Sequence, residues 1–187
     1  MNRPDASPAP KPRIRTLIPR QELERRVAEL AREIERDHPD PRGMIAIGVL
    51  KGSVFFLVDL LKHLSIPVEV DFLQASSYAG TNRGEVRIQQ DLQIPIQGRD
   101  VLLIEDIVDT GHTLNTLLGL LRYRGAKSVK LCALLDKREA REVEVPIDYC
   151  GFPIENLFVV GYGLDLDEKY RNLPYIGVVE TDEEEGE

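Results

Sequence analysis

The spacing of apolar residues along the chain predicts helices and strands in alternation. Leu23, Val27, Leu30 and Ile34 recur at intervals of four, three and four residues, which is typical of an amphipathic helix. Short, almost continuous apolar runs predict strands that are covered on both faces. Two further helices are expected over 54–64 and 113–125, and strands over 44–50, 67–76, 101–106, 128–137, 147–152, 156–162 and 175–179.

Strands that alternate with helices form βαβ units, so we expect an α/β fold with a mainly parallel, twisted sheet flanked by helices. In such sheets, ligands bind at the carboxyl ends of the strands. The chemistry of the protein should therefore follow residues 50, 76, 104 and 136.

The length of 187 residues fits one domain, which we expect to span residues 15–180. Residues 1–14 are rich in proline, alanine and charge and should form a disordered tail, and residues 181–187 should form an acidic one. The hydrophobic fraction of 42% and the charged fraction of 30% are ordinary for a soluble globular protein. No apolar run approaches the roughly 20 residues of a membrane helix, and the N-terminus lacks the features of a secretory signal.

The formal net charge of −8 comes largely from the end of the chain. Six of the 32 acids lie in the last eight residues, which leaves 26 acids against 24 lysines and arginines. We interpret this end as a solvated tail, with a partner-binding tail as the alternative. The balanced remainder lacks the basic stripe of a nucleic-acid-binding protein, so we expect neither nucleic acid nor membrane as a partner. Cys132 and Cys150 fit reduced thiols in the cytoplasm.

The segment 101–114, VLLIEDIVDTGHTL, carries the clearest chemical signal. Four apolar residues form a buried strand, and Glu105 and Asp106 follow; as strand neighbours they should point to opposite faces and have different roles. Residues 109–113 then open a helix whose first N–H groups would face an anion such as phosphate. Acids beside a phosphate favour a ligand that also has sugar hydroxyls, together with Mg²⁺.

A simpler interpretation of the same residues stays open. Asp109 and Thr113 would merely cap the helix, and Glu105 and Asp106 would be solvated loop acids. Against it, two acids that directly end an apolar central strand lie where parallel sheets bind ligands. The P-loop pattern GxxxxGK[ST] and the dinucleotide pattern GxGxxG are both absent from the chain.

The segment 101–114 resembles the ribose-phosphate signature of the type I phosphoribosyltransferases, and specifically of their hypoxanthine-guanine branch. The resemblance covers about residues 15 to 180. Leu50-Lys51-Gly52 is similar to the pyrophosphate loop of the family, and Ser77-Tyr78 to the start of its mobile lid, here 76–88. Leu135-Asp136-Lys137-Arg138 is similar to the purine-selecting segment and 158–179 to the C-terminal hood, while His112 stands at a position that varies in the family.

The resemblance implies a fold and a reaction. The fold would be that of the type I phosphoribosyltransferases, with a small hood formed largely by residues 137–180 and by the N-terminal part of the domain. The reaction would move 5-phosphoribosyl from 5-phosphoribosyl 1-pyrophosphate to hypoxanthine or guanine, giving IMP or GMP and pyrophosphate in purine salvage. Such an enzyme is a pentosyltransferase that uses Mg²⁺, and it would form a homodimer or homotetramer.

The resemblance also implies roles around the ribose phosphate. Glu105 and Asp106 would hold the ribose hydroxyls, partly through Mg²⁺, and Asp109 would be the acid and base at purine N7. The 5′-phosphate loop would consist of Asp109, Thr110, Gly111, His112 and Thr113.

The implied pyrophosphate and purine contacts come from four other segments. Lys137 would donate to the 6-oxo group of the purine, which argues against adenine because its amino group is also a donor. Phe158 would stack on the purine and Val159 would offer backbone groups to its edge. Asp165 would lie near the purine and bind a second Mg²⁺. The pyrophosphate contacts would be Lys51, Gly52, Ser77, Tyr78 and Arg171, with a cis peptide bond before Lys51.

A structural ion pair is the alternative to the implied ligand contacts of Asp165 and Arg171. Asp165 and Arg171 are six residues apart, too far round a continuous helix for a local ion pair.

Two other functions are compatible with the family resemblance: a xanthine-preferring phosphoribosyltransferase, and a non-catalytic nucleotide-sensing regulator with the same fold. The hood argues against uracil as the substrate, and a regulator would be expected to have lost Asp109, Lys51 or Arg171.

Overall fold

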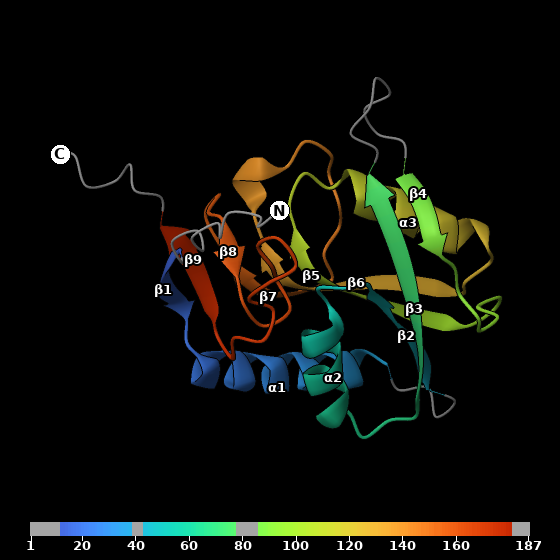
Figure 1. Cartoon of the computed structure of the whole chain (residues 1–187). Helices are drawn as coiled ribbons and strands as arrows, with labels where there is room; N and C mark the ends of the chain where they lie inside the picture. Colours follow the sequence, from blue (N-terminus) through green and yellow to red (C-terminus); the bar gives the residue numbers. More distant parts are fainter. Residues whose placement is uncertain (1–11, 39–42, 78–85, 181–187) are drawn as a thin grey trace, which may run out of the picture.

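The computed structural model describes residues 12–38, 43–77 and 86–180. It contains a large sheet of six strands in the order β4-β3-β2-β5-β6-β7 and a small sheet in the order β1-β9-β8 (Figure 1). Neighbouring strands of the large sheet are parallel except for β3 and β4. The predicted α/β fold with a mainly parallel sheet is therefore confirmed.

The elements have the following bounds. The helices are α1 (Arg20–Asp37), α2 (Val54–Lys62) and α3 (His112–Tyr123), with a single 3-10 turn at Arg138–Ala140. The strands are β1 (Arg13–Ile18), β2 (Met44–Val49), β3 (Val68–Ser77), β4 (Val86–Gln90), β5 (Asp100–Val108), β6 (Ser128–Asp136), β7 (Tyr149–Pro153), β8 (Val159–Val160) and β9 (Ile176–Glu180). In the described ranges, none of these helices combines the length and apolar character that crossing a membrane requires.

Successive residues of the central strands face two separate cores. In β2, Met44 and Ala46 pack with α1 and α2, whereas Ile45 and Ile47 pack with α3. The cause is the alternation of side chains along a strand. Helices therefore cover both faces of the sheet, α1 and α2 on one side and α3 on the other (Figure 1), and the carboxyl ends of the strands stay available for a ligand.

The small sheet joins the two ends of the described chain. β1 pairs antiparallel with β9, and β9 pairs antiparallel with β8. Arg13 and Ile14, which we expected in the N-terminal tail, belong to β1 and lie opposite Glu180 and Val179. A strand of this kind is specified by its distant partner more than by its own composition, which explains why the apolar pattern did not predict it.

Two other expectations about the strands need correction. The run 156–162 forms a strand only at Val159–Val160, because Gly161, Tyr162 and Gly163 have φ angles of 96°, 49° and 107°. These left-handed values end an extended strand. The run Val86–Gln90 is a strand, β4, although its polar sequence suggested only the end of a lid; the remainder of that lid, 78–85, lies outside the described residues.

The two cysteines are free thiols with a structural place. Cys132 is fully buried in β6, and burial raises the pKa of its thiol. A thiol in such surroundings packs as a small apolar side chain.

Candidate active site

Residues 109–111 form the turn from β5 into α3, at the carboxyl end of a central strand, and His112 and Thr113 begin that helix. Gly111 has a φ angle of 91°, and a Cβ at this position would lie 2.4 Å from the Val143 carbonyl oxygen, so the turn requires glycine. α3 begins at His112, and the first N–H groups of any helix lack acceptors within it. These groups and the positive end of the helix dipole favour an anion, which fits the expected phosphate loop.

The simpler interpretation, in which Asp109 and Thr113 cap this helix, finds no support in the described residues. The N-cap residue of α3 is Gly111, and no side chain makes a capping hydrogen bond there. The Asp109 side chain is 53% exposed, and its nearest recorded cation, the Nζ of Lys137, lies 3.8 Å from the carboxylate. Asp109 is thus neither turned into the core nor held in a buried ion pair.

Glu105 and Asp106 lie inside β5, which continues to Val108, and their carboxyl groups interact. Burial raises the pKa of Glu105 well above its ordinary range, and the charge of Asp106 and a side-chain hydrogen bond with it raise it further. Burial also raises the pKa of Asp106, although hydrogen bonds and the positive charge of Arg171 act in the opposite direction. The expectation of opposite faces was wrong, because the two carboxyl groups meet; the expectation of different roles stays a prediction. The two acids form one pair, with Asp106 buried and Glu105 partly buried, that a cation would stabilise.

Lys137 joins the ends of two central strands. Its N–H donates to the Val108 carbonyl at 3.0 Å, and the residue is only 7% exposed. A buried ammonium needs acceptors, yet the 3.8 Å to Asp109 exceeds a hydrogen-bond length. Lys137 therefore has donors available for a carbonyl oxygen of a ligand. This arrangement fits the implied contact with the 6-oxo group of a purine.

The loop after β2 lies directly against the acid pair. The Leu50–Lys51 peptide bond is cis, which confirms the expectation. A Cβ on Gly52 would lie 1.6 Å from Oδ2 of Asp106, so no other residue can stand there without displacing that carboxylate. A Cβ on Gly163 would in turn lie 2.0 Å from the Gly52 carbonyl oxygen. The candidate pyrophosphate loop thus lies against the Asp106 side chain on one side and against the backbone of the C-terminal hood on the other.

The cations implied for pyrophosphate, Lys51 and Arg171, share one carboxylate oxygen. Oε2 of Glu168 lies 2.9 Å from Nζ of Lys51 and 3.3 Å from Nη2 of Arg171. Nη2 of Arg171 also lies 2.9 Å from Oδ1 of Asp165, and its Nη1 donates to the Gly163 carbonyl at 2.7 Å. The buried Nε of Arg171 has no acceptor within the described residues. An anion placed among these groups would therefore find a free donor.

The close pair between Asp165 and Arg171 contradicts our expectation from their spacing. The expectation assumed a helix, but Asp167, Glu168 and Tyr170 have φ angles of 52°, 61° and 70°. These left-handed residues fold the segment into tight turns, which brings residues six positions apart together. The sequence also did not single out Glu168, because three acids precede Arg171 within six residues and their order alone does not tell which one faces Lys51.

Within the described residues, the hood offers an aromatic face and a strand edge that has no partner strand. Phe158 is 55% exposed, and β8 lies at the edge of the small sheet. Val159 faces Val178, and the N–H of Val179 donates to the Phe158 carbonyl. This pattern makes Val159 and Val178 a non-hydrogen-bonded pair, so the N–H and C=O of Val159 point away from β9. Both features fit a contact with the face and edge of a base.

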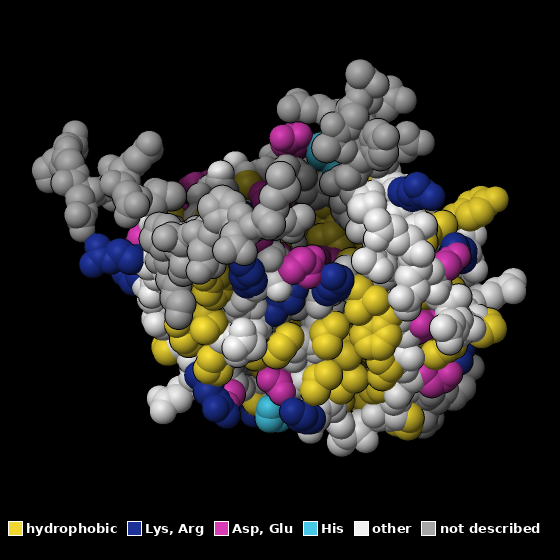
Figure 2. Space-filling view, in the orientation of Figure 1, with side chains coloured by type: hydrophobic (Ala, Val, Ile, Leu, Met, Phe, Trp, Pro, Cys, Tyr) yellow, Lys and Arg dark blue, Asp and Glu magenta, His cyan; other side chains and the backbone are white. Residues whose placement is uncertain are grey.

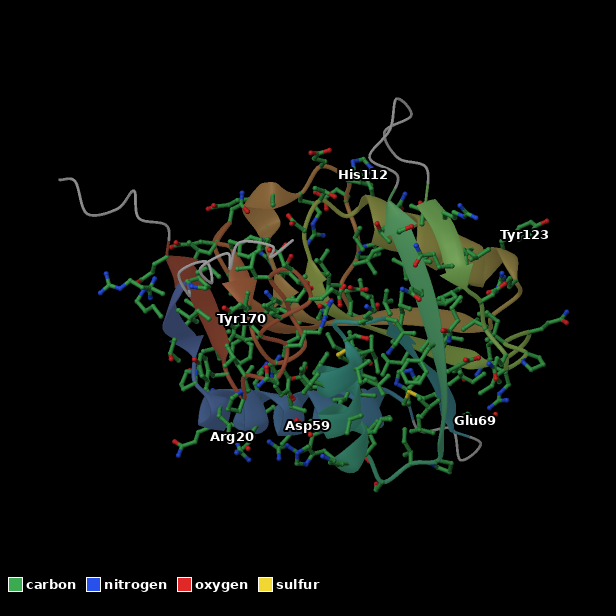
Figure 3. All side chains as sticks on the ribbon, viewed as in Figure 1. Arg20, Asp59, Glu69, His112, Tyr123 and Tyr170 are labelled. Atoms are coloured by element: carbon green, nitrogen blue, oxygen red, sulfur yellow. The ribbon has the colours of Figure 1, made fainter. Side chains whose placement is uncertain are left out.

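For three further residues that the family resemblance assigns to the site, the described part of the structure shows no contact with the candidate residues described above. His112 lies at the start of α3, where its Nε2 is 2.9 Å from Oε2 of Glu142 (Figure 3). That partner was not expected from the sequence. Ser77 is the last residue of β3 and pairs with Val86 of β4. Tyr78 lies outside the described residues.

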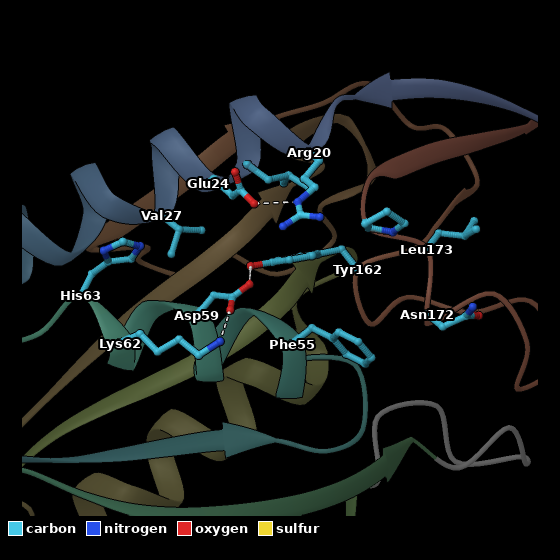
Figure 4. Close-up of a pocket in the computed structure, with 12 residues that line it drawn as sticks. Arg20, Glu24, Val27, Phe55, Asp59, Lys62, His63, Tyr162, Asn172 and Leu173 are labelled. Carbon is cyan, nitrogen blue, oxygen red and sulfur yellow. Dashed lines mark hydrogen bonds and ion pairs between the residues drawn. The ribbon is translucent and has the colours of Figure 1, made fainter.

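A cavity of about 530 Å³ lies elsewhere, between α1, α2 and residues 172–174 (Figure 4). Its charged side chains bond to one another: Arg20 to Glu24 at 2.7 Å, and Asp59 to both Lys62 and the Tyr162 hydroxyl. Figure 3 shows Arg20 and Asp59 beside α1 and α2, far from His112 at the candidate phosphate loop. None of the candidate residues lines this cavity, so we do not place the active site there.

A family model for the phosphoribosyl transferase domain matches residues 16–167. The hypoxanthine-guanine phosphoribosyltransferase of Bacillus subtilis is 47% identical over 88% of this chain and 92% of its own length. The chain belongs to the hypoxanthine-guanine phosphoribosyltransferase family. A bifunctional TilS/HprT protein of Listeria monocytogenes is 50% identical over 90% of the chain, but the chain covers only 26% of that relative.

Solved members of the family have the same fold. A hypoxanthine-guanine phosphoribosyltransferase of Bacillus anthracis, with a HEPES molecule in its active site, matches with a TM-score of 0.86 and 42% identity over 91% of this chain and 100% of its own. A Trypanosoma cruzi hypoxanthine phosphoribosyl transferase, studied for the role of its C-terminal region in oligomeric state and activity, matches with a TM-score of 0.85 and 40% identity, over 89% of this chain and 91% of its own. The type I phosphoribosyltransferase fold is therefore established for this chain.

Replacing Glu105 by glutamine should stabilise the ligand-free protein at pH 8. Because the folded-state pKa is raised, folding binds the proton more tightly, and wild-type stability falls as the pH rises from the ordinary carboxyl value of 4.5 through the folded-state value. Neutral glutamine escapes this loss. The gain should be about 0.5–2 kcal/mol, or roughly 2–4 °C per kcal/mol in a melting curve, and should vanish near pH 4.5. The exposed Glu155→Gln change is the control; an unchanged or lower melting temperature of Glu105→Gln at pH 8 would contradict the pair.

Replacing Glu168 by glutamine should tighten the binding of inorganic pyrophosphate by about two- to fivefold, the effect of removing a competing exposed ion pair. Lys51, followed by Arg171, holds the pKa of Glu168 below its usual range, so the glutamate is an anion that competes for both cations. Isothermal titration of pyrophosphate with Mg²⁺ measures the change. Glu69→Gln, which removes the same charge from the far end of β3, is the matched control (Figure 3). Weaker binding than in that control would mean that Glu168 assists the ligand instead.

Proposed function

We propose that the protein is a Mg²⁺-dependent hypoxanthine-guanine phosphoribosyltransferase that transfers 5-phosphoribosyl from 5-phosphoribosyl 1-pyrophosphate to the base. The observation that carries the proposal is the approach of Lys137 to Asp109, 3.8 Å apart, beside the glycine turn before α3. A donor for a carbonyl and an acceptor for a ring proton lie next to a site suited to phosphate. An oxopurine and a ribose 5′-phosphate offer these groups together.

The base would be read and deprotonated by the same two side chains. Lys137 donates to the 6-oxo oxygen, and Asp109 accepts the N7 proton while N9 forms the bond to C1 of the ribose. The bond between C1 and the pyrophosphate oxygen breaks, and its electron pair leaves with pyrophosphate. A positioned base of this kind contributes about 10²- to 10⁴-fold to the rate. Adenine would present an amino group to the Lys137 ammonium, donor against donor.

The pyrophosphate leaving group would bind to Lys51 and Arg171, which lie on the side of the acid pair formed by the loop after β2 and the hood. Lys51, the Gly52 backbone and Arg171 would stabilise the negative charge on pyrophosphate. Glu168 releases Lys51 and Arg171 when the ligand binds, since all of them meet at one oxygen. Ser77 and Tyr78 would contribute contacts from the lid, which would keep water from the ribose during transfer.

Carboxylates suited to Mg²⁺ lie on both sides of the proposed pyrophosphate site. In the described part of the chain, no group of three or more His, Cys, Asp or Glu residues could hold a metal by itself. Mg²⁺ binds through one or two carboxylates together with water and substrate phosphates, so the Glu105–Asp106 pair and Asp165 fit that ion. When bound, it would neutralise charge on the acids and on pyrophosphate. The ribose hydroxyls would bind the same acid pair.

The purine would be enclosed by the hood. Phe158 exposes its ring, and the outward backbone groups of Val159 would pair with the edge of the base. Free thiols at Cys132 and Cys150 are compatible with a cytoplasmic location, which stays a prediction.

A base-panel assay tests the function. Full-length protein with 5-phosphoribosyl 1-pyrophosphate and Mg²⁺ should form nucleotide from hypoxanthine and guanine, and little or none from adenine and uracil. Asp109→Asn should lower turnover by about 10²-fold or more while the protein stays folded. Product from xanthine above that from hypoxanthine would favour the xanthine alternative, and no product from any base would favour a nucleotide-sensing regulator.

We further propose that the protein is a homodimer or homotetramer, as a second copy would cover an exposed apolar face. Phe55, Val58 and Val70 are 41%, 43% and 39% exposed, and Figure 2 shows a hydrophobic patch over α2 and β3. Apolar patches of this kind mark interfaces between proteins. Oligomeric state is also a studied property of the Trypanosoma cruzi relative.

Light scattering during gel filtration tests this assembly. The wild type should have a multiple of the 21.1 kDa chain mass, and Val58→Glu should lower it by placing a charge in the interface. Tyr123→Glu is the control, since Tyr123 is 90% exposed on α3 (Figure 3) and should leave the mass unchanged. A monomeric wild type would refute the proposal.

A further inference from the structure

One buried guanidinium connects the candidate purine segment with the candidate phosphate loop. Arg141 follows the 3-10 turn after β6, and its side chain is 11% exposed. Its Nη2 bonds to Oδ1 of Asp136, the last residue of β6, which is 3% exposed. Its Nε donates to the Asp109 carbonyl at 3.2 Å, and its Nη1 donates to the Val145 carbonyl at 3.4 Å. The three acceptors come from three different segments.

The residues next to Arg141 hold the same turn by its backbone. The N–H groups of Glu142 and Val143 both donate to the Thr110 carbonyl at 3.0 Å. Gly111 lies against the Val143 carbonyl so closely that a Cβ would come within 2.4 Å. No side chain caps α3 at Gly111, so the contacts of residues 141–143 help to hold this turn from outside.

We propose that Arg141, oriented by Asp136, is a positioning residue that sets the place of Asp109 relative to Lys137. The inference rests on the proposed function for its kinetic consequence, but the geometric claim stands on the contacts of Arg141. Asp136 directly precedes Lys137, so one guanidinium ties the purine donor and the proton acceptor to a common support. A buried ion pair is weak evidence for a stabilising role, because desolvation offsets the attraction. Its directional bonds to two carbonyls are what a positioning role requires.

Only a guanidinium suits this geometry. Its planar fork offers five donors in fixed directions, whereas an ammonium is a point charge on a flexible stem. Arg141→Lys would keep the charge beside Asp136 but could not also reach the carbonyls of Asp109 and Val145. The conservative variant should therefore fail to restore activity.

The chain provides a matched control in Arg138. Its Nε lies 3.1 Å from Oδ2 of the same Asp136, but its side chain is 81% exposed. Among the described residues, the side chain of Arg138 bonds to Asp136 and makes no hydrogen bond to residues 109–111. Arg138→Met and Arg141→Met thus remove the same charge from the same carboxylate, and differ in the contact with Asp109.

The kinetic experiment compares Arg141→Met, Arg141→Lys and Arg138→Met in the full-length protein with hypoxanthine. Displacement of a catalytic group by about 1 Å can lower turnover by about 10²-fold. We expect kcat to fall about 10- to 100-fold in both Arg141 variants and far less in Arg138→Met. The dissociation constant of pyrophosphate should change less than about twofold, because Lys51 and Arg171 do not contact Arg141. Equal kcat values for Arg141→Met and Arg138→Met would overturn the inference.

A second measurement does not depend on turnover. Hydrogen exchange of the amides in residues 109–115 should be faster in Arg141→Met than in Arg138→Met, because the turn loses its support. If Arg141→Met does not fold, Asp136→Asn replaces it, since it keeps the shape of the side chain but removes the negative charge that orients the guanidinium. Equal exchange in these variants would overturn the positioning role. An inactive wild type with faster exchange in Arg141→Met would instead refute the proposed function and leave the positioning of Asp109 intact.

Discussion

The close approach of Gly52 to Asp106 is the contact around which the site is arranged. A side chain at position 52 would occupy the place of the Asp106 carboxylate, and Gly163 must be small for the same reason against the Gly52 carbonyl. The loop after β2, the end of β5 and the hood can therefore meet only while both positions are glycine. This contact brings the candidate pyrophosphate loop next to the carboxyl pair and places Arg171 where its charge acts on Asp106. The groups that we propose for sugar, pyrophosphate and metal are then next to one another.

The ligand-free site has unbalanced charge at two places. The Glu105–Asp106 pair has an excess of negative charge, and the cluster around Arg171 has a donor without an acceptor in the described residues. Glu105 and Asp106 are two acids with raised pKa values, so that place lacks a cation. At the other place, Glu168 and Asp165 bind the cations Lys51 and Arg171, and still leave Nε of Arg171 without an acceptor in the described residues. A ligand that brings Mg²⁺ and pyrophosphate together would correct both places at once. Such arrangements lower the stability of the free protein in exchange for binding.

The sequence predicted the parts of the molecule whose signal is local. The apolar runs of β2, β5 and β6 are strong because helices cover both faces of these strands, and the turn at 109–113 follows from the residues of that turn. β1 and β4 were missed because pairing with β9 and β3 defines them, and such pairing leaves little trace in composition. The partners of Arg171 were missed for a similar reason, since three left-handed residues in the segment 167–170, which no simple periodicity reveals, bring Asp165 and Glu168 to it. Arg138 and Arg141 both follow Lys137 closely, and no sequence pattern tells that only Arg141 is shielded from solvent and contacts Asp109.

In the proposed function, the specificity of the hood would depend on backbone position more than on residue type. An edge strand exposes unpaired N–H and C=O groups, and proteins usually cover such edges. β8 is an edge strand whose Val159 groups point away from β9, and the exposed ring of Phe158 lies beside them. A planar base with donors and acceptors along one edge would form hydrogen bonds with the Val159 backbone, as a partner strand would. The face of the base would stack on the Phe158 ring. The 2-amino group of guanine would then be recognised by a carbonyl oxygen, which every residue possesses. The sequence therefore predicts a 6-oxo contact through Lys137, but not the preference between hypoxanthine, guanine and xanthine, which would depend on how β9 holds β8 against the base.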